Sequence, residues 1–326
     1  MPRKFAFQMD PMESLNIAGD STFALMLAAQ KRGAALFHYD VKTLAYEAGR
    51  LWCMAHPVRV QRPELANPGA HFDFGAAQTL DLGADVDAIF MRQDPPFDLG
   101  YITATHLLER IRHQTLIVND PASVRNAPEK LFVLDYARFM PPTLITRSLA
   151  DVRAFQAEHG DIVVKPLHGN AGSAVFKIGR DGSNLPALTE LFGQVWREPF
   201  MVQAFLPDVA AGDKRIVLVD GAVAGAINRI PGSGEIRSNL AAGGSAHKTA
   251  LTPQEYEICA ALGPELKARG LIFVGIDVIG GKWLTEINVT SPTGIVAIEN
   301  FDGTDIAGMI LDCVESKLTN GYKLLK

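Results

Sequence analysis

Three oxygen-bearing side chains lie on a segment whose other residues predict buried β-structure. Residues 277–294, DVIGGKWLTEINVTSPTG, are typical of a β-hairpin, yet Asp277, Glu286 and Asn288 occupy positions where apolar strand residues are expected. Glu286 and Asn288 are two residues apart, so their side chains leave the same face of one strand about 6.7 Å apart. The sequence therefore predicts a shared polar face on this hairpin.

The position of Asp277 relative to Glu286 depends on the turn of the hairpin. A Gly281-Lys282 turn puts the two carboxylates directly opposite each other, and a Gly280-Gly281 turn puts them on a diagonal. Both turns keep the carboxylates on one face, whereas a three-residue loop would weaken that inference.

Two opposed carboxylates indicate a bound cation. They repel each other, and burying either one alone would cost on the order of several kcal/mol. An all-oxygen set of Asp, Glu and Asn suits Mg²⁺, which takes one or two carboxylates and completes its shell with water and substrate phosphates. The alternative is the solvated face of an edge hairpin, which would account for any single acid but less well for three oxygen ligands together.

Two lysines are placed where they can meet phosphate groups. Lys165 ends the apolar strand DIVVKP, and the turn after it contains Gly169 and Gly172, whose backbone N–H groups can fold over an anion. Lys130, in NAPEKLF, lies at the junction of two expected domains. The turn lacks the GK[ST] of a Walker A loop, and an ordinary hairpin with exposed lysines is the competing interpretation.

A strand that ends in a polar loop is suited to a flat heterocycle. In FMVQAFLPDVAAGDKRIVLV the hinge between strand and loop offers apolar side chains and free backbone groups, and Asp213 can accept hydrogen bonds from ribose hydroxyls. Taken by itself, the same stretch is interpreted as a simple sheet crossover.

Four arginines lie at strand ends or in a long loop rather than on helix faces: Arg92, Arg215, Arg229 and Arg237. Arginine captures carboxylate or phosphate in a bidentate manner, so these residues favour a pocket for an acidic substrate, although a surface position is the default for each. His168 and His247 have no partner at a recognisable spacing and receive no catalytic role. The sequence has no GxSxG, HExxH or GxGxxG motif. It therefore predicts neither a covalent hydrolase, nor a zinc protease, nor a dinucleotide-dependent oxidoreductase.

Residues 1–122 alternate strands and helices. The predicted strands are KFAFQM, AALFHYD, VDAIFMR and TLIVND, and the predicted helices are STFALMLAAQKRG, capped by Asp20 or Ser21, and LGYITATHLLERIR. Repeated βαβ units of this kind predict a small parallel α/β domain, in which residues 50–80 are less regular.

From residue 123 the pattern becomes α+β. A helical stretch, PASVRNAPEKLFVLDYA, is followed by helix SLADVRAFQAEHG and by strands DIVVKP and SAVFKIG. DKRIVLVDGAVAGAINRI is a hairpin that turns at Asp220-Gly221, and TPQEYEICAALGPELKARG is a helix with a capping box from Thr252 to Glu255. Residues 229–248 show no periodicity, and a loop of this length is usually either a lid or disordered; composition alone favours the second.

Composition bounds the class of protein. The 326 residues carry a formal charge of −5 and no Lys/Arg-rich run, which argues against a nucleic-acid surface. Three separated cysteines suggest neither a disulfide framework nor a zinc site. The apolar run at the N-terminus stops at Asp10, and no stretch approaches the ~18 residues of a membrane span. A protein of about two domains in a reducing cytoplasm, with no membrane partner, is expected.

In combination, the order of these features resembles that of the ATP-grasp ligases. Six stretches, spread along nearly the whole chain, look like the bacterial glutathione synthetases: MRQDPPFD, NAPEKLF, GDKRIVLVDG, RIPGSGEIRSNLAAGG, LIFVGIDVIG and LTEINVTSPTG. The chain departs from the family pattern at His168, at Gly294 and in GGSAHK. The resemblance implies an ATP-grasp fold, α/β and α+β, with an N-terminal Rossmann-like (pre-ATP-grasp) α/β domain.

The resemblance also implies domain bounds and site residues. The N-terminal domain would cover residues 1–122 and the ATP-grasp domain 123–318, with subdomains near 123–202 and 203–318 and a lid over 230–246. Arg215 and Arg229 would act in catalysis. ATP would be bound by Lys130, Lys165, Gly169, Gly172, Gln203, Ala204, Phe205, Leu206 and Asp213. Two Mg²⁺ ions, with Mn²⁺ as an alternative, would be held by Asp277, Glu286 and Asn288. The substrates would be contacted by Arg92, Arg237, Asn239, Ser291 and Thr293.

The reaction implied by the resemblance is ATP-dependent amide formation. The cysteinyl carboxylate of γ-glutamylcysteine attacks the γ-phosphorus of ATP, and the amine of glycine displaces phosphate from the acyl phosphate, giving glutathione, ADP and phosphate. Such a reaction needs charge neutralisation and exclusion of water. The alternatives are another ATP-grasp carboxylate–amine ligase and a nucleotide-binding module without turnover. The family implies a cytoplasmic homotetramer.

Overall fold

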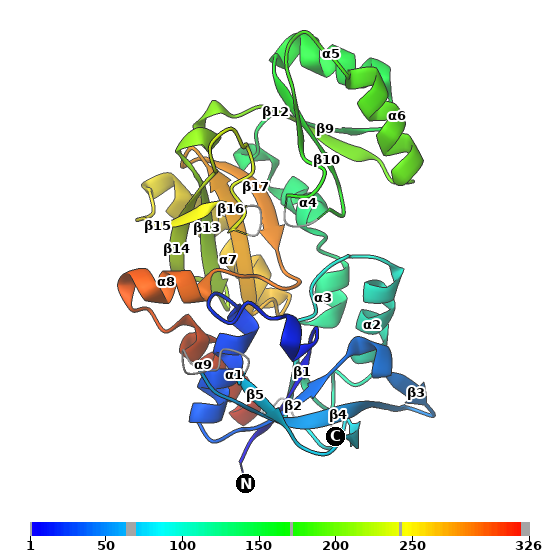
Figure 1. Ribbon diagram of the computed structural model, residues 1–326, viewed down its shortest axis with the longest axis vertical. Coiled ribbons are helices and arrows are strands. Elements are labelled where there is room, and N and C mark those ends of the chain that lie inside the picture. The colour runs from blue at the N-terminus through cyan, green and yellow to red at the C-terminus, as the bar shows by residue number, and fades with distance from the viewer. Residues whose placement is uncertain (1, 63–69, 170–171, 241–242, 321–326) are drawn as a thin grey trace.

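Three sheets make up the architecture of the described chain. The computed structural model describes residues 2–62, 70–169, 172–240 and 243–320, so residues 170–171 of the glycine turn and 241–242 of the expected lid lie outside it. The sheets have eight, four and five strands in chain order. In Figure 1 the eight-stranded sheet lies at the bottom, the five-stranded sheet in the middle and the four-stranded sheet at the top.

The eight-stranded sheet has a parallel centre. Four strands pair in parallel in the order β2 (Ala35–Tyr39), β1 (Lys4–Gln8), β7 (Ala88–Met91) and β8 (Leu116–Val118). The helices of this region are α1 (Ser21–Lys31), α2 (Leu99–Glu109) and α3 (Pro121–Arg125). The predicted βαβ units are confirmed, and Asp20 caps α1 by accepting a hydrogen bond from the Phe23 N–H.

The prediction of a purely parallel domain is wrong, because this sheet is mixed. The long strand β4 (Arg50–Val60) pairs antiparallel with β2. It also pairs with three short strands: β3 (Ala45–Glu47), β5 (Phe72–Phe74) and β6 (Gln78–Asp81). Leu51, Cys53 and Ala55 of β4 are fully buried, whereas Met54 is exposed. Apolar residues on both faces of β4 conceal the alternation by which a half-buried strand is recognised.

The helical stretch predicted after β8 is broken into short pieces. Helix α3 is followed by α4 (Glu129–Phe132) and by a 3-10 turn, η3 (Val133–Phe139). Pro128 directly precedes α4, and the residue before a proline is disfavoured in the helical region, so a single helix is interrupted there. The break leaves Glu129 and Lys130 on a separate short helix, which packs against β17 of the last sheet.

The four-stranded sheet forms a small antiparallel unit with its own core. Its strand order is β11 (Phe176–Ile178), β10 (Ile162–Pro166), β12 (Phe200–Ala204) and β9 (Thr143–Thr146). Helices α5 (Leu149–His159) and α6 (Leu185–Val195) cover one face, where Ile162 and Phe192 are buried together. Lys165 and Gln203 leave the opposite face, because side chains alternate along a strand.

The five-stranded sheet is antiparallel and carries the predicted polar hairpin. Its order is β15 (Ser245–Lys248), β14 (Ala222–Ile230), β13 (Asp213–Val219), β16 (Phe273–Ile279) and β17 (Trp283–Asn288). Its helices are α7 (Pro253–Ala268), α8 (Ile295–Asp302) and α9 (Ile306–Thr319). The turn at Asp220-Gly221, with φ of +48° and +82°, is confirmed, as is the capping box of Thr252 and Glu255. Strand β15 was not predicted.

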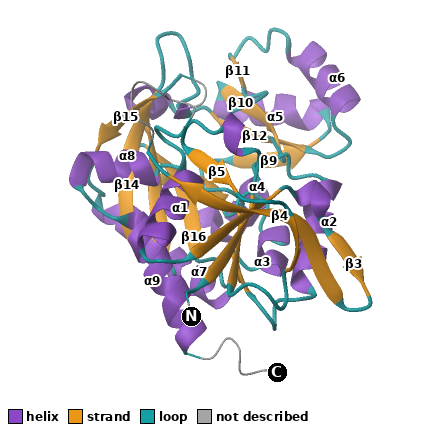
Figure 2. Cartoon of the chain, turned by 60° about the horizontal axis from the view of Figure 1, so that its bottom comes forward, coloured by secondary structure: helices purple, strands orange, loops and turns teal. Residues whose placement is uncertain are grey.

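The eight-stranded and five-stranded sheets are packed together. Each of two large clusters of buried apolar side chains contains residues from both sheets, whereas the four-stranded unit has a separate cluster. The Asn119 amide donates to the carbonyls of Phe273 and Val289 at 2.7 and 2.8 Å, and α1 and α9 lie side by side (Figure 2). The smallest sheet is therefore the part with the least shared core. None of the described helices is long and apolar enough to span a membrane.

Candidate functional site

The hairpin of β16 and β17 brings Asp277 opposite Glu286. The predicted two-residue turns are wrong, because the loop has three residues, 280–282, and Ile279 pairs with Trp283. That register, if continued, would pair Asp277 with Thr285 and turn Glu286 to the other face. A β-bulge after Asp277 adds one residue on β17 and restores the pairing of the two carboxylates.

Two arginines hold the first carboxylate of this pair. The Arg215 Nε and Nη2 donate to the two oxygens of Asp277 at 2.6 and 3.0 Å. Arg229 donates to Asp213 at 2.5 Å and lies 3.0 Å from Asp277. Burial would raise the pKa of Asp277, but the two guanidinium groups outweigh burial and hold this pKa well below its usual range. We call these four buried residues the arginine cluster.

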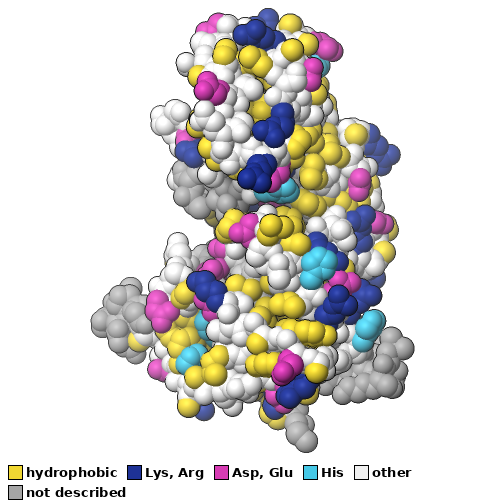
Figure 3. Space-filling view, turned by 90° about the vertical axis from the view of Figure 1, so that its right-hand side faces the viewer, with side chains coloured by type: hydrophobic (Ala, Val, Ile, Leu, Met, Phe, Trp, Pro, Cys, Tyr) yellow, Lys and Arg dark blue, Asp and Glu magenta, His cyan; other side chains and the backbone are white. Residues whose placement is uncertain are grey.

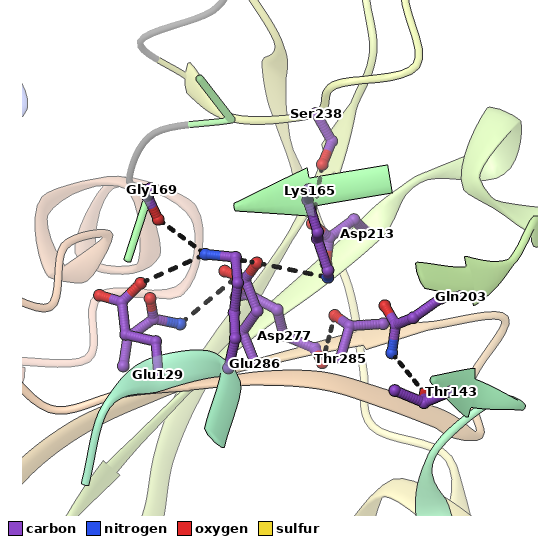
Figure 4. A network of polar contacts seen from close by, with 12 residues as sticks. Glu129, Thr143, Lys165, Gly169, Gln203, Asp213, Ser238, Asp277, Thr285 and Glu286 are labelled. Carbon is purple, nitrogen blue, oxygen red and sulfur yellow. Dashed lines mark hydrogen bonds and ion pairs between the residues drawn. The ribbon is translucent and has the colours of Figure 1, made fainter. Parts of the chain in front are cut away.

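Two lysines hold the second carboxylate. The Nζ atoms of Lys130 and Lys165 lie 3.3 and 3.6 Å from the same oxygen of Glu286. Figure 4 shows Lys165 pointing toward Glu286. Lys130 also donates to the Gly169 carbonyl at 2.7 Å and lies 3.9 Å from Glu129. The interpretation of Lys130 and Lys165 as exposed cations is wrong, since both are buried. We call Lys130, Lys165, Glu129 and Glu286 the lysine cluster.

Burial and charge act differently on the members of the lysine cluster. Burial would raise the pKa of Glu286, yet the two lysines lower it. Burial lowers the pKa of Lys165 despite the attraction of Glu286, whereas Glu286 and Glu129 raise the pKa of Lys130 against the effect of burial. The single carboxylate of Glu286 thus does not fully compensate two buried ammonium groups.

A first pocket lies between the four-stranded and five-stranded sheets. It has about 830 Å³ of empty space, which includes space open to solvent. Many predicted site residues line it: Lys130, Lys165, Gly169, Gly172, Gln203, Ala204, Phe205, Leu206, Asp213, Arg237, Asn239, Asp277 and Glu286. In the space-filling view the four-stranded unit stands apart from the rest of the molecule across a constriction (Figure 3).

One end of the first pocket is apolar. Val163 and Val175 lie there beside the predicted hinge. The Gln203 side-chain nitrogen donates to the Thr143 hydroxyl at 2.9 Å, and the Lys177 ammonium lies 3.9 Å from the centre of the Phe205 ring. The pocket therefore offers a flat apolar slot at one end and two ammonium groups at the other.

A second pocket adjoins the first at Glu286, which lines both. The predicted residues along it are Arg215, Arg229, Asn239, Glu286, Asn288, Ser291 and Thr293. Residues not predicted also line it, among them Asp94, Glu129 and Thr290. The lysines thus face the first pocket and the arginines face the second.

Arg92 is the one predicted substrate-binding residue that lines neither pocket. It is buried, and its Nε and Nη2 donate to the Thr22 hydroxyl at 3.0 Å and to the Pro292 carbonyl at 2.9 Å. Ser291 donates in turn to the Arg92 carbonyl at 3.2 Å. Arg92 therefore holds in place the segment that forms one wall of the second pocket.

The segment predicted as a lid, 230–246, begins at the last residue of β14 and ends within β15. Its residues Arg237 and Asn239 line the first pocket, and the Ser238 hydroxyl donates to Asp213 at 2.7 Å. A Cβ placed on Gly172 would lie 2.7 Å from the Asn239 amide oxygen, so the segment also touches the glycine turn. Its described part covers the first pocket.

Glu129 is a site residue that sequence reasoning missed. It lines the second pocket and a small cavity beside His168. Burial raises the pKa of Glu129 to about 7, with Lys130 opposing the shift. Its position next to Lys130 in NAPEKLF was the available signal. His168 stacks on Phe97 with ring centres 5.9 Å apart, and the exposed His247 lies 2.8 Å from the Ser245 hydroxyl.

The side-chain oxygen atoms on the hairpin fit a hard divalent cation as ligands. The Asn288 amide nitrogen points to the Gly275 carbonyl at 3.2 Å and to Asp277 at 3.4 Å, which leaves the amide oxygen free to coordinate. No group of three or more His, Cys, Asp and Glu side chains forms a metal site within the described residues. A cation here would therefore take two carboxylates and complete its shell with amide, water or phosphate oxygens, as Mg²⁺ does.

Two family models match the chain. Residues 3–125 match the model described as prokaryotic glutathione synthetase, N-terminal domain. Residues 129–303 match the model described as prokaryotic glutathione synthetase, ATP-grasp domain.

Curated relatives match over nearly the whole chain. The chain is 52% identical to the glutathione synthetase of Rhodopseudomonas palustris, with 97% of this chain and 99% of that protein covered. It is 51% identical to the protein of the same name in Agrobacterium fabrum, covering 97% of each, and 45% identical to that of Shewanella oneidensis, covering 97% and 99%.

Solved structures share the fold. The D-cycloserine synthetase DcsG superposes with a TM-score of 0.67 at 18% identity, covering 95% of this chain and 99% of that one. The ATP-grasp ligase PsnB complexed with minimal precursor gives 0.63 at 18% identity, covering 97% and 99%. The expected ATP-grasp fold is confirmed.

Proposed function

The chain belongs to the prokaryotic glutathione synthetase family, and from this premise we propose how its two pockets divide the reaction. The protein is an ATP-dependent ligase that forms glutathione. One observation carries the proposal: Glu286 lines both pockets, with the lysines facing one and the arginines facing the other. Phosphoryl transfer would take place at this shared wall.

ATP occupies the first pocket in this proposal. Its adenine lies in the apolar slot at the hinge Gln203–Leu206, and its phosphates reach Lys130 and Lys165, with Gly169 and Gly172 beside them. The surplus of positive charge around Glu286 supports this placement, because a phosphate oxygen can replace the carboxylate as the partner of a lysine. At Asp213, a ribose hydroxyl would replace the Ser238 hydroxyl as donor.

The family uses ATP together with a divalent metal ion. We assign two Mg²⁺ ions, replaceable by Mn²⁺, to Asp277, Glu286 and Asn288, where they would neutralise the β- and γ-phosphates. The all-oxygen donor set on one face of the hairpin supports this choice.

The second pocket receives the carboxylate substrate and the amine. The cysteinyl carboxylate of γ-glutamylcysteine attacks the γ-phosphorus of ATP, and the amine of glycine then displaces phosphate from the acyl phosphate. Arg215 and Arg229 neutralise the developing charge, and their bonds to Asp277 and Asp213 hold them in position before the substrate arrives. The lid keeps out water that would hydrolyse the acyl phosphate.

Substrate contacts are assigned to the rim of the second pocket and to the lid. Ser291 and Thr293 contribute from the wall, and Arg237 and Asn239 contribute from the lid. Arg92 acts through the Pro292 carbonyl and so positions this wall rather than touching the substrate. From the family we also propose that the protein is cytoplasmic and forms a homotetramer. Light scattering of the purified protein would test the tetramer.

The test of the function is a substrate-omission assay. ADP release is followed with ATP, Mg²⁺, γ-glutamylcysteine and glycine, and then with each amino substrate left out in turn. Full ADP release is expected only when γ-glutamylcysteine and glycine are both present. Mass spectrometry should then identify glutathione as the product. ADP formation that does not depend on glycine would overturn the assignment and favour a ligase that adds a different amine.

A further inference from the structure

Glu129 is a partly buried carboxyl group at the site to which the reaction above gives no role. It is at the first position of α4, and its side chain is 17% exposed. One of its oxygens accepts a hydrogen bond from the Thr290 hydroxyl at 3.4 Å. It has no bidentate partner of the kind that holds Asp277, so it remains free to accept another donor.

The position of Glu129 relative to Glu286 sets its distance from the reacting centre. The Lys130 ammonium lies 3.9 Å from Glu129 and 3.3 Å from Glu286, so one lysine separates the two carboxylates. Glu286 lines both pockets, whereas Glu129 lines the second pocket and not the first. Glu129 thus lies on the side of the shared wall where the acyl phosphate would be attacked.

The second pocket is polarised. Arg215 and Arg229 are cations of its lining, while Asp94 and Glu129 supply carboxylates beside Pro95. A zwitterionic amino acid has one charge of each sign, and such a pocket can orient both. The carboxylates are the groups that an ammonium would approach.

The groups that face Glu129 come from several elements. Burial raises the pKa of the Glu129 carboxyl to about 7. Lys130 on the same helix and Arg215 on β13 lower this pKa, whereas Glu286 and Asp277 on the hairpin raise it. His168 lines the small cavity on the other side, and burial lowers its pKa. A carboxyl group that is partly ionised near neutral pH can both accept and release a proton during turnover.

We propose that Glu129 binds the ammonium group of glycine in the second pocket and removes its proton, acting as the general base of amide formation. The inference rests on the proposed function, because it requires an acyl phosphate at the shared wall. Glu129 lies outside the hairpin to which the metal ions are assigned, and it is not a member of the arginine cluster.

The step balances with the groups already named. One proton passes from the glycine ammonium to the Glu129 carboxylate, and the freed lone pair forms the C–N bond at the acyl carbon. The C–O bond to phosphate breaks, and its electron pair leaves with the phosphate. The second proton on nitrogen goes to the departing phosphate, and Glu129 returns its own proton to solvent.

The experiment compares two nucleophiles with Glu129→Gln, which keeps the size of the side chain but cannot accept the proton. With glycine, kcat/KM is expected to fall by about 10²- to 10³-fold, the usual contribution of a general base. With hydroxylamine, which is largely unprotonated at neutral pH, hydroxamate formation should stay within about threefold of the wild-type rate because no base is needed. Glu129→Asp should recover part of the glycine activity, and Glu265→Gln, an exposed acid on α7, serves as the matched control.

The pH profile provides a second readout. In the wild-type enzyme, kcat/KM for glycine should fall as the pH drops below about 7, because a protonated Glu129 cannot accept a proton. In Glu129→Gln this rate should instead keep rising with pH as free amine accumulates. Equal losses with both nucleophiles, or a glycine rate that matches the wild type, would overturn the proposal. A wild-type enzyme that forms hydroxamate but no glutathione would contradict the proposed function itself.

Discussion

The arginine cluster and the lysine cluster both surround a carboxylate of the same hairpin with two cations, yet they are built differently. The arginines contact Asp213 and Asp277 at 2.5–3.0 Å, with one bidentate pair. The lysines stand 3.3 and 3.6 Å from a single oxygen of Glu286. A guanidinium fixes a carboxylate through its planar fork, whereas an ammonium is a point charge on a flexible stem. The difference indicates that the arginine cluster is a fixed scaffold and the lysine cluster an exchangeable one.

The charges of the two clusters support this distinction. Two arginines face two aspartates, so the arginine cluster is balanced by itself. Two lysines face Glu286 and Glu129, and burial raises the pKa of Glu129 to about 7, so this cluster carries a net positive charge near neutral pH. A phosphate would complete the lysine cluster, whereas the charges of the arginine cluster are already balanced before any ligand binds.

Inserting one alanine between Thr285 and Glu286 should have the largest effect, because the bulge takes up one extra residue and not two. A second extra residue would turn Glu286 to the opposite face of β17 and away from both lysines. Loss of glutathione formation and a lower midpoint of thermal unfolding are expected.

Thr285→Val is the matched control for this insertion. It keeps the bulge and removes only the 3.2 Å hydrogen bond from the Thr285 hydroxyl to the Asp277 carbonyl, which is worth about 0.5–1.5 kcal/mol. Its turnover should remain close to wild type. An active insertion variant would mean that the register of β17 does not set the position of Glu286.

Glu286→Gln should separate catalysis from folding. The substitution keeps the shape of the side chain and removes the charge shared by the two lysines, so turnover should fall by about 10²- to 10³-fold or more. Circular dichroism should show a folded protein, because the arginine cluster is untouched. Turnover within tenfold of wild type would show that Glu286 does not have the role assigned to it.

The comparison also shows what the sequence could predict. Local patterns sufficed for the βαβ units, for the Asp220-Gly221 turn and for the capping box of α7, because each is decided by residues close together in the chain. The sequence correctly predicted that Asp277 and Glu286 lie on one face, although both two-residue turns used in that inference are wrong. The residues around Thr285 carry no pattern that predicts the bulge, since it depends on how β17 pairs with β16.

Burial was the property that the sequence could not supply. Lys130 and Lys165 could also be interpreted as exposed cations, and Glu129 was not singled out. Their burial results from packing between α4, β10 and β17, which lie far apart in the chain. Strand β4 was missed for a related reason, because Met54 is apolar and yet exposed.

Arg215→Met and Lys165→Met test the contrast between scaffold and exchangeable charge. Arg215→Met leaves buried Asp277 with Arg229 alone and should reduce the free energy of unfolding by about 3–5 kcal/mol. Lys165→Met should change it by less than about 1 kcal/mol, because Glu286 keeps Lys130 and a buried charge is removed. Urea unfolding without ligands measures both. Equal losses in the two variants would contradict the distinction between the clusters.

Ser238→Ala should have the smallest effect and defines where the fixed cluster meets the lid. The variant loses the 2.7 Å hydrogen bond from the Ser238 hydroxyl to Asp213, while Asp213 keeps Arg229. The free energy of unfolding should change by about 1 kcal/mol or less, because a surface loop can detach without opening the core. The lid should open more often, so protease cleavage within residues 231–240 should be about threefold faster without ATP, and saturating ATP should remove the difference. Cleavage at the wild-type rate would mean that the lid is held by Arg237 and Asn239 against the glycine turn rather than by Asp213.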